Sequence, residues 1–311
     1  MPKNPLAPFR VDPVLTGISI AYTNENMIAD HVLPRVPVAK QAFEWRKYDI
    51  RDGFTIPDTH VGRTSRPIQV EFGFEVETDS TVNYAIEDPI PNDDILNAPK
   101  GFNPTMYASE QLSKLLVLSR ESRVAQLVFN PASYASQNVT TLTGNVQWSD
   151  PASSPVPVIL DALDKVVMRP NIGILGRAVW TKLRQHPKIV SAILANPGES
   201  GVVALNAVAD LLELDAIFVG EAWLNTVNRG QDPQLARAWG KHAAFIYRDS
   251  LATASTGMTF GFTAQWGQRV AGLIDDPNIG MRGGQVVRVG ESVKELICAK
   301  DVGYFFQNAV A

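Results

Sequence analysis

The segment from Ile68 to Glu77 constrains the fold more than any other part of the sequence, because apolar and polar residues alternate along it without a break. Apolar residues at every second position from Ile68 to Val76 would share one face of a strand, with three glutamates among the residues of the other face. Residues 41–50 supply aromatic and basic side chains to pair with this strand. The two segments predict an antiparallel hairpin.

This hairpin is longer than usual. At about 3.3 Å per residue, strands of ten residues span about 33 Å, whereas an ordinary strand has about 5 to 6 residues. The 17-residue connection at residues 51–67 is polar and contains two glycines and two prolines. We expect a hairpin that projects from its domain, although a hairpin that lies flat on its own domain fits the pattern equally well.

Prolines dominate residues 1–37, which contain six of them. Each proline fixes the backbone φ angle and removes a hydrogen-bond donor, so this stretch is expected to form an extended arm that lies along another surface. One short helix over residues 25–29, capped by Thr23 or Asn24, can interrupt the arm.

A long helix is predicted from Pro104 to Asn130. Asn103 is a suitable N-cap, proline suits the first helical position, and Asn130-Pro131 ends the pattern. About 26 residues make a rod of about 39 Å. Its apolar stripe contains Leu112, Leu115, Leu116, Val124, Leu127 and Val128, with Arg120 among the residues between them.

The remainder alternates between helix and strand, so the predicted fold class is mixed α+β. Helices are expected at 156–168, 178–185 and 202–212, and buried strands at 172–175, 216–219 and 243–247. Two further strands, at 286–289 and 293–299, are expected with Gly290-Glu291 at the turn between them.

Charge and targeting signals exclude several classes of protein. A net charge of −4 provides no positive field to hold nucleic acid nonspecifically. No signal peptide or membrane span is visible, so a cytosolic, soluble protein is expected. Cys298, the only cysteine, lies in an apolar stretch, where we expect a buried and unreactive thiol.

No pattern of catalytic, cofactor-binding or metal-binding residues emerges. The four histidines (His31, His60, His186 and His242) form no pair with helical ligand spacing, and neither a nucleophile elbow nor a phosphate-binding loop is present. The pairs Asp93-Asp94 and Asp275-Asp276 stand in turn contexts. We therefore expect no enzyme, no cofactor and no metal, while an α/β enzyme with an unrecognised site remains an alternative.

Several stretches, in this order, carry a family resemblance. They are Val32 to Val38 before the hairpin, Arg66-Pro67 leading into the alternating strand, Gly176 to Leu183 with His186-Pro187, and Leu211 to Asp215 running into Val219 to Ala222. Together with the arm, hairpin and long helix, they resemble the major capsid proteins of tailed bacteriophages with the Hong Kong 97-like fold.

The resemblance implies a division of the chain. Residues 1–38 would be the N-terminal arm, 39–87 the E-loop hairpin, 88–170 the peripheral domain with its spine helix, 171–276 the axial domain, and 277–311 the strands that return to the peripheral domain. The axial tips would meet at the centres of hexamers and pentamers. An encapsulin shell, which encloses cargo enzymes in the same fold, is the alternative that the sequence separates least.

The resemblance also implies partners. The subunits would form an icosahedral shell around double-stranded DNA without sequence-specific binding, assembled in the host bacterial cytoplasm and found in the virion. Because the arm starts near Met1, a separate scaffolding protein is expected, with a portal and a possible decoration protein. Some members of the family that this chain resembles join a hairpin lysine to an asparagine of a neighbouring subunit. Residues 51–66 contain no lysine, so the resemblance implies a noncovalent shell here. The candidate subunit contacts are Arg51, Asp52, Arg63, Arg66, Glu71 and Glu75.

Overall fold

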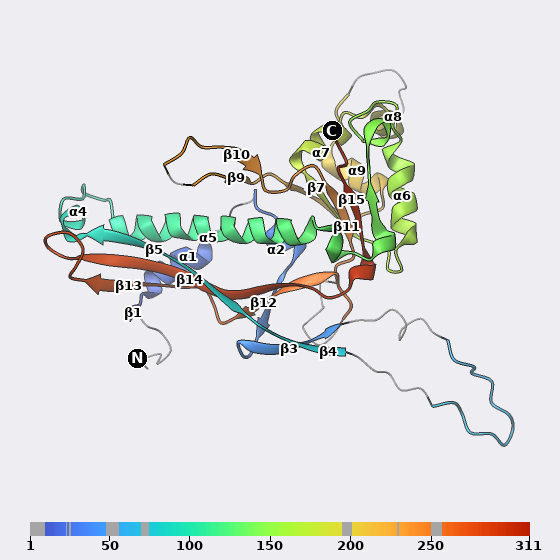
Figure 1. The fold of residues 1–311 in the computed structure, drawn as a ribbon, viewed down its shortest axis with the longest axis horizontal. Coiled ribbons are helices and arrows are strands. Elements are labelled where there is room, and N and C mark those ends of the chain that lie inside the picture. Colours follow the sequence, from blue (N-terminus) through green and yellow to red (C-terminus); the bar gives the residue numbers. More distant parts are fainter. Residues whose placement is uncertain are drawn as a thin grey trace.

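A long helix lies along an elongated β-sheet, and a second, compact sheet stands at one end of both (Figure 1). The computed structural model describes residues 10–22, 24, 26–47, 56–69, 75–194, 201–228, 230–249 and 257–311. The long helix is α5 (Pro104–Val128). Its N-terminus is formed as the sequence predicts, because the Asn103 side chain accepts hydrogen bonds from the backbone N–H groups of Thr105 and Met106.

The elongated sheet, called the long sheet below, is built around one 14-residue strand, β14 (Gly284–Ile297). The strand order is β1-β13-β14-β12-β2, and β5 pairs with the other edge of β14. The remaining strands are β1 (Arg10–Val11), β2 (Arg35–Val38), β5 (Val82–Pro91), β12 (Gly261–Trp266) and β13 (Val270–Asp276).

The prediction of two strands separated by a turn at Gly290-Glu291 is wrong. Gly290 lies within β14, where it is paired with Ala85 of β5 on one side and with Val270 of β13 on the other. The glycine suits this crowded position, since an added Cβ would lie 3.0 Å from the Ala85 side chain. The strand is therefore continuous because both neighbours hold it extended.

The compact sheet has the order β6-β15-β11-β7-β8 and lies beside four helices in the compact unit. Its strands are β6 (Val139–Thr141), β7 (Ile172–Gly176), β8 (Ala216–Gly220), β11 (Ala243–Ile246) and β15 (Gly303–Gln307). Its helices are α6 (Pro155–Lys165), α7 (Arg177–Leu183), α8 (Pro187–Leu194) and α9 (Leu205–Leu211). The predicted β7, β8, β11, α6, α7 and α9 are confirmed within a few residues, whereas α8 was not predicted.

Sheet membership does not follow the order of the chain. β12 and β13 belong to the long sheet, although they follow the compact-sheet strand β11, and β15 returns to the compact sheet beside β11 and β6.

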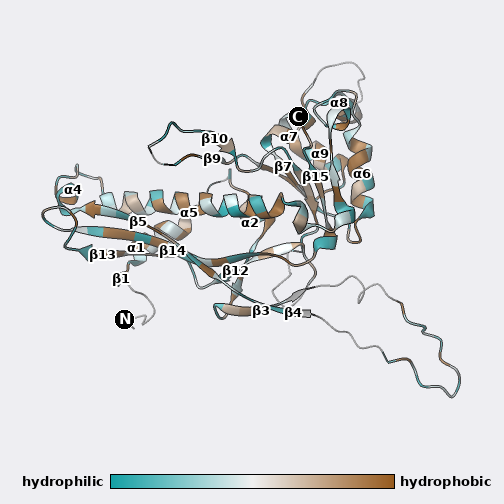
Figure 2. Ribbon diagram, viewed as in Figure 1, coloured by the Kyte–Doolittle hydropathy of each residue, from teal (hydrophilic) through white to brown (hydrophobic). Residues whose placement is uncertain are grey.

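Figure 2 shows brown, apolar segments alternating with teal ones along α6, which turns its apolar side chains toward the compact sheet. The shared core makes the compact unit one packed body.

The N-terminal region differs from its prediction. A helix was expected at residues 25–29, but the structure forms α1 (Pro13–Ala21) and α2 (Ala29–Val32). Asp12 caps α1 by accepting hydrogen bonds from the backbone N–H groups of Val14 and Leu15. The start of α1 thus repeats the arrangement at Asn103-Pro104, with a capping side chain followed by proline.

Two separate pairs of short antiparallel strands complete the fold of the described residues. β9 (Trp223–Asn225) pairs with β10 (Leu235–Arg237), and β3 (Ala42–Lys47) pairs with β4 (Glu75–Ser80). A short helix, α4 (Asn92–Leu96), links β5 to the loop before α5. Single 3₁₀ turns lie at η1 (Pro131–Ser133), η2 (Ser136–Asn138), η3 (Gly144–Val146) and η4 (Lys300–Val302).

Candidate assembly surfaces

The β3–β4 pair forms the base of the predicted hairpin, and its connection extends away from both sheets (Figure 1). Every residue from 56 to 69 is exposed, including Ile56 at 88% and Ile68 at 57%. Within the described chain, the hydrogen bonds of this segment are local, from His60 N–H to Asp58 and from Ser65 N–H to the Gly62 carbonyl. The segment is called the hairpin loop below, and it rests on no other part of the subunit that the structure describes.

Pairing in the hairpin gives a different buried face from the one predicted. Trp45 lies opposite Glu77, and Arg46 lies opposite Val76, so Val76 points away from the tryptophan. Val76 is 47% exposed, whereas Trp45 and Phe43 are buried. The apolar face that the alternation predicted as buried is therefore open at Val76 and Ile68 in the single subunit.

The base of the hairpin is anchored on the long sheet. Phe43 and Trp45 pack with Phe262 of β12 and with Cys298, which follows β14. Burial, with a smaller effect of the Glu77 carboxylate, raises the pKa of the Cys298 thiol to about 12. The prediction of a buried cysteine is confirmed. The base is thus fixed while the loop extends outward.

The predicted contact residues fall into three groups. Arg63 and Arg66 are exposed on the hairpin loop, and neither has an ion-pair partner in the described part of the chain. Glu75 begins β4, where its backbone is paired with Lys47. Arg51, Asp52 and Glu71 lie outside the described residues. A single subunit does not bring these residues together.

A groove follows the open edge of β5 beside α5. One part is lined by residues of both elements, among them Tyr84, Leu112 and Leu115, and Leu115 is 50% exposed. β5 pairs with β14 alone in the described structure, so its other edge presents unpaired backbone groups. An extended chain could therefore be accommodated along this edge.

A second, separate pocket lies between β5 and the start of α5. It is lined by Phe102 and Tyr107, whose rings lie 5.5 Å apart, together with the carboxylates of Asp88 and Asp94. Neither carboxylate has an ion-pair partner among the described residues. This pocket is thus apolar on its aromatic side and negatively charged at its two carboxylates. It is called the β5 groove below.

Charged residues inside the subunit, which the sequence did not single out, hold the N-terminal region. Glu121 of α5 is fully buried and accepts hydrogen bonds from the backbone N–H groups of Ile28 (3.0 Å) and Ala29 (2.8 Å). The indole N–H of Trp239 donates to the same carboxylate at 2.5 Å. Burial raises the pKa of Glu121 despite these donors. The carboxylate therefore joins α2, α5 and the segment before β11.

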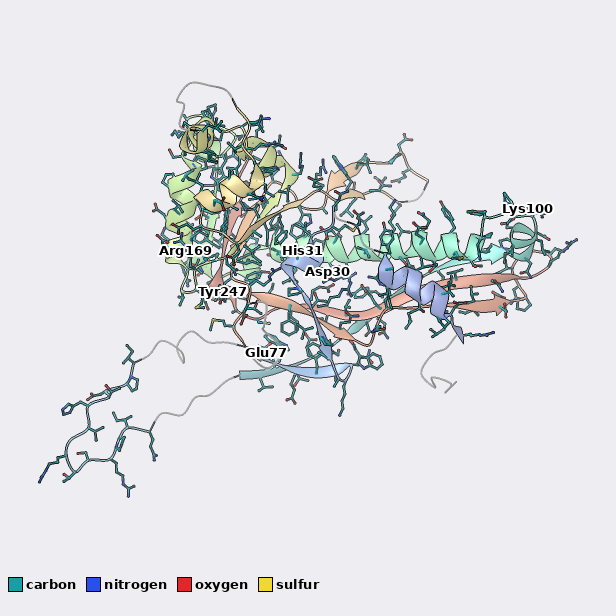
Figure 3. The ribbon with its side chains drawn as sticks, turned by 180° about the vertical axis from the view of Figure 1, so that it is seen from behind. Asp30, His31, Glu77, Lys100, Arg169 and Tyr247 are labelled. Carbon is teal, nitrogen blue, oxygen red and sulfur yellow. The ribbon has the colours of Figure 1, made fainter. Side chains whose placement is uncertain are left out.

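Arg120, the preceding residue, holds the other end of α2. Its guanidinium donates to the Leu33 carbonyl (3.0 Å) and to Thr263 (2.9 Å), and it pairs with Asp30 at 2.5 Å. Burial opposes ionisation of Asp30, but the positive charges of Arg120 and Arg35 outweigh it and lower the pKa of this carboxyl. Figure 3 labels Asp30 and His31 where α2 meets α5.

The network extends to the long sheet through two more arginines. Arg35 pairs with Asp30 and with Glu291, each at 2.9 Å, and Arg269 pairs with Glu291 at 3.3 Å. Arg269 also donates to the Ser19 carbonyl at the end of α1. The sequence offered no signal for this network, because α5 and β14 carry polar and charged residues along their whole length and only the packing buries these ones.

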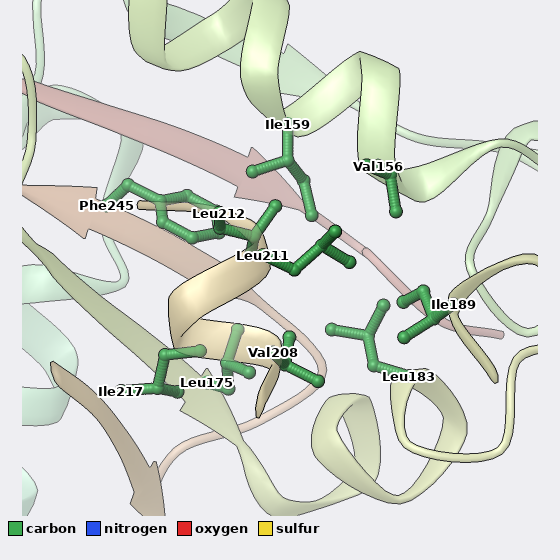
Figure 4. Close-up of a pocket in the computed structure, with 10 residues that line it drawn as sticks. All are labelled: Val156, Ile159, Leu175, Leu183, Ile189, Val208, Leu211, Leu212, Ile217 and Phe245. Atoms are coloured by element: carbon green, nitrogen blue, oxygen red, sulfur yellow. The ribbon is translucent and has the colours of Figure 1, made fainter. Parts of the chain in front are cut away.

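One enclosed cavity lies within the compact unit. Figure 4 shows apolar side chains of the compact unit around it, including Phe245, Leu212 and Ile159. Its volume is about 10 Å³ and no polar atom lines it, so it is a packing gap. In the described residues, no group of three or more His, Cys, Asp or Glu side chains could hold a metal ion, and no helix could span a membrane.

Three comparisons relate the chain to known proteins. The major capsid protein of Pseudomonas phage JBD67 is 59% identical over 305 residues, which cover 98% of this chain and 99% of that protein. A phage-related protein from Bordetella bronchiseptica RB50 has a solved structure with a TM-score of 0.76 and 22% identity, covering 97% and 99% of the two chains. A chain of the cyanophage P-SCSP1u capsid has a TM-score of 0.58 and 8% identity, covering 92% and 89%.

The two structural likenesses concern the fold alone, because both identities are low. They confirm the predicted mixed fold of the Hong Kong 97-like class. No family model matches the chain.

Proposed function

Because this chain belongs to the family of phage major capsid proteins, we propose that its copies form hexamers and pentamers of an icosahedral shell around double-stranded DNA. The relationship identifies a structural subunit of the virion capsid and not an enzyme. The encapsulin alternative is also disfavoured, since a relative with 59% identity over nearly the whole chain is a phage capsid protein.

The hairpin loop carries this proposal. Its apolar side chains at Ile56, Val61 and Ile68 are exposed, and no other part of the described subunit covers them. Exposed apolar side chains that recur along one segment favour contact with another protein surface. In a shell, the adjacent copy supplies that surface.

The β5 groove of the adjacent copy is the proposed receptor. Its unpaired carboxylates, Asp88 and Asp94, complement Arg63 and Arg66 of the incoming loop, and its aromatic side chains can cover the apolar ones. The open edge of β5 can bind an extended backbone. Further contacts between subunits are proposed at Arg51, Asp52, Glu71 and Glu75.

The domains follow from the same proposal. The long sheet with α5 would be the peripheral domain, and the compact unit would be the axial domain that meets its copies at capsomer centres. These bounds differ from the predicted ranges 88–170 and 171–276, because α6 packs on the compact sheet and because β12 and β13 pair in the long sheet. Residues 1–38 would be the N-terminal arm, residues 39–87 the E-loop, and residues 277–311 a connection that returns through β14 before β15 joins the compact sheet.

Other proteins complete the proposed assembly. A separate scaffolding protein would guide the shell in the host cytoplasm, a portal would occupy one vertex, and a decoration protein can bind the finished surface. The net charge of −4 supports enclosure of DNA without tight binding.

Electron microscopy of the purified chain, alone and coexpressed with its scaffolding protein, tests the function. Closed particles with hexameric and pentameric units are the expected result. A strictly monomeric protein under both conditions contradicts it. Particles boiled in detergent should run as single chains, because the shell is proposed to be noncovalent, and a ladder of covalent oligomers would contradict that part.

A further inference from the structure

Helix α1 exposes a face without a single polar side chain. Val14 is 60% exposed and Ile20 is 47% exposed, and Pro13, Gly17 and Ala21 are exposed beside them. The opposite face packs inward, where Leu15 joins the core of α5 and the long sheet. In the view from behind, the blue helix α1 lies on the near side of the molecule (Figure 3).

Gly17, at the centre of this face, is not required by packing against any described part of the subunit. A Cβ added there would meet no atom within 4 Å. The residue is helical and not in the left-handed region, so no backbone conformation requires glycine. Glycine in the middle of a helix is less stable than alanine. A glycine at such a position is useful where another backbone approaches closely.

The exposed face is symmetric about Gly17. Val14 and Ile20 lie three residues to either side of it, and Pro13 and Ala21 lie four residues to either side. At 100° per residue, these positions span one face about 120° wide. The helix, PVLTGISIA, contains no charged residue.

These features fit a second copy of the same chain. Where two copies meet across a twofold axis, a residue on the axis faces itself, and residue i contacts residue j while j contacts i. A charge near the axis would repel its own copy, and α1 has none. Past Ile20, Tyr22 and Met27 line an adjoining groove that also holds the charged side chains of Asp30, Arg35 and Arg269, so the apolar surface ends there.

We propose that α1 forms a twofold contact between two copies of this chain, with the helices antiparallel and crossing at Gly17. Val14 of each helix then packs against Ile20 of the other. This inference rests on the proposed shell, which contains twofold axes between its capsomers, and it adds a contact independent of the hairpin loop.

Cross-linking in assembled particles tests the geometry. In a C298A background, which removes the native thiol, G17C places one cysteine on the axis. Particles of G17C treated with a short bismaleimide should convert most subunits to dimers. V14C particles and I20C particles should each give few dimers, whereas particles assembled from both variants together should give dimers that contain one subunit of each.

The mixed particles distinguish an antiparallel twofold contact from any other. Dimers from V14C alone, or G17C particles that stay monomeric after treatment, would overturn the proposal. If G17C does not assemble, cross-linking between V14C and I20C in mixed particles decides the question. The N-terminal residues of the same subunit are the other possible cover, and they would leave all variants without dimers.

A bulky substitution separates this proposal from the proposed function. G17L should leave the subunit folded, because the space above Gly17 is open, but should strongly reduce closed particles. Full particle yield from G17L would contradict the α1 contact while the capsid function stands. Absence of particles from the unsubstituted chain would contradict the capsid function itself.

Discussion

The guanidinium of Arg120 lies 2.5 Å from the carboxylate of Asp30, joining the middle of the long helix to the helix that follows the N-terminal arm. The adjacent Glu121 binds the N-terminal backbone of that same helix. Two consecutive residues of α5 thus hold both ends of α2, with the acidic group at its N-terminus and the basic group at its C-terminus, as the helix dipole favours. The N-terminal region is therefore fixed to α5 at residues 28–33, in addition to the packing of Leu15 in α1.

Replacing Arg120 should destabilise the subunit strongly. R120M removes the buried guanidinium that donates to Leu33 and Thr263, while Asp30, which is 55% exposed, keeps Arg35 as a partner. Hydrogen bonds to a buried charged group contribute about 1.5–3 kcal/mol, so a loss of that size is expected. Chemical denaturation measures the loss. R169M is the matched control, because Arg169 forms ion pairs with Asp164 and Glu213 at the exposed surface, where such pairs contribute about 0–1 kcal/mol. Equal effects of the two variants would contradict a structural role for the buried guanidinium.

Asp30 and Glu121 should affect the pH dependence of stability in opposite directions. The pKa of Asp30 is lowered in the folded chain. Its contribution to stability is therefore fully present above pH 3.8, its ordinary pKa, and is lost as the pH falls through the pKa of the folded state. The pKa of Glu121 is raised in the folded chain. Its contribution to stability is therefore fully present below pH 4.5, its ordinary pKa, and is lost as the pH rises through the pKa of the folded state. Unfolding free energies of the native chain should exceed those of D30N increasingly as pH rises, whereas the difference from E121Q should decrease. Slopes of the same sign would contradict this assignment.

Local signals predicted those elements whose ends are fixed by their own residues. Asn103-Pro104 identified the start of α5 because the cap and the proline act within one turn. The same signal at Asp12-Pro13 was overlooked, since the surrounding prolines indicated an extended arm. Helix α1 was therefore predictable from the sequence.

Other features depend on distant partners and were not predictable. Gly290 lies within a strand because β5 and β13 both pair with it, and nothing in its neighbourhood along the chain reports those partners. Arg120 was interpreted as a residue between apolar positions, yet it is buried because Asp30 and Leu33 supply its hydrogen bonds. The sequence predicted that the face of the hairpin containing Val76 is buried, but this side chain is exposed. The buried face is the one that contains Trp45, because Trp45 packs against the long sheet.

The Cys298 thiol should be unreactive until the protein unfolds. A pKa of about 12, compared with the ordinary 9.0, lowers the thiolate fraction about 10³-fold at neutral pH, and burial also blocks access. Labelling with a chromogenic disulfide reagent should be slow in the native chain and complete within minutes in denaturant. Rapid labelling of the native protein would show that the base of the hairpin opens.

Reversing the charge of the hairpin loop should block assembly without unfolding the subunit. R63E combined with R66E places negative charges against Asp88 and Asp94 of the proposed receptor, and like charges across an interface cost several kcal/mol. Particle yield by electron microscopy should fall sharply, while thermal unfolding stays unchanged because the loop is exposed and packs against no described part of its own chain.

Two further variants test whether this effect comes from the proposed ion pairs. R63K with R66K keeps the charge and should still assemble. Adding D88R and D94R to the R63E, R66E variant should restore particles. If neither the charge reversal nor the rescue changes the particle yield, the loop binds at a different surface.

Two glycines should respond to alanine with opposite signs. At Gly176, an added Cβ would lie 2.1 Å from the Gly240 carbonyl oxygen and 2.2 Å from that of Trp239, so G176A must displace backbone at a cost of about 1–3 kcal/mol or more. At Gly17, a Cβ meets nothing, and G17A should stabilise the isolated subunit by up to about 1 kcal/mol. Thermal unfolding of both variants as unassembled subunits measures the difference. A stabilising G17A would show that the isolated chain gains nothing from glycine at this position, as the proposed α1 contact requires, and a destabilising G17A would contradict that requirement.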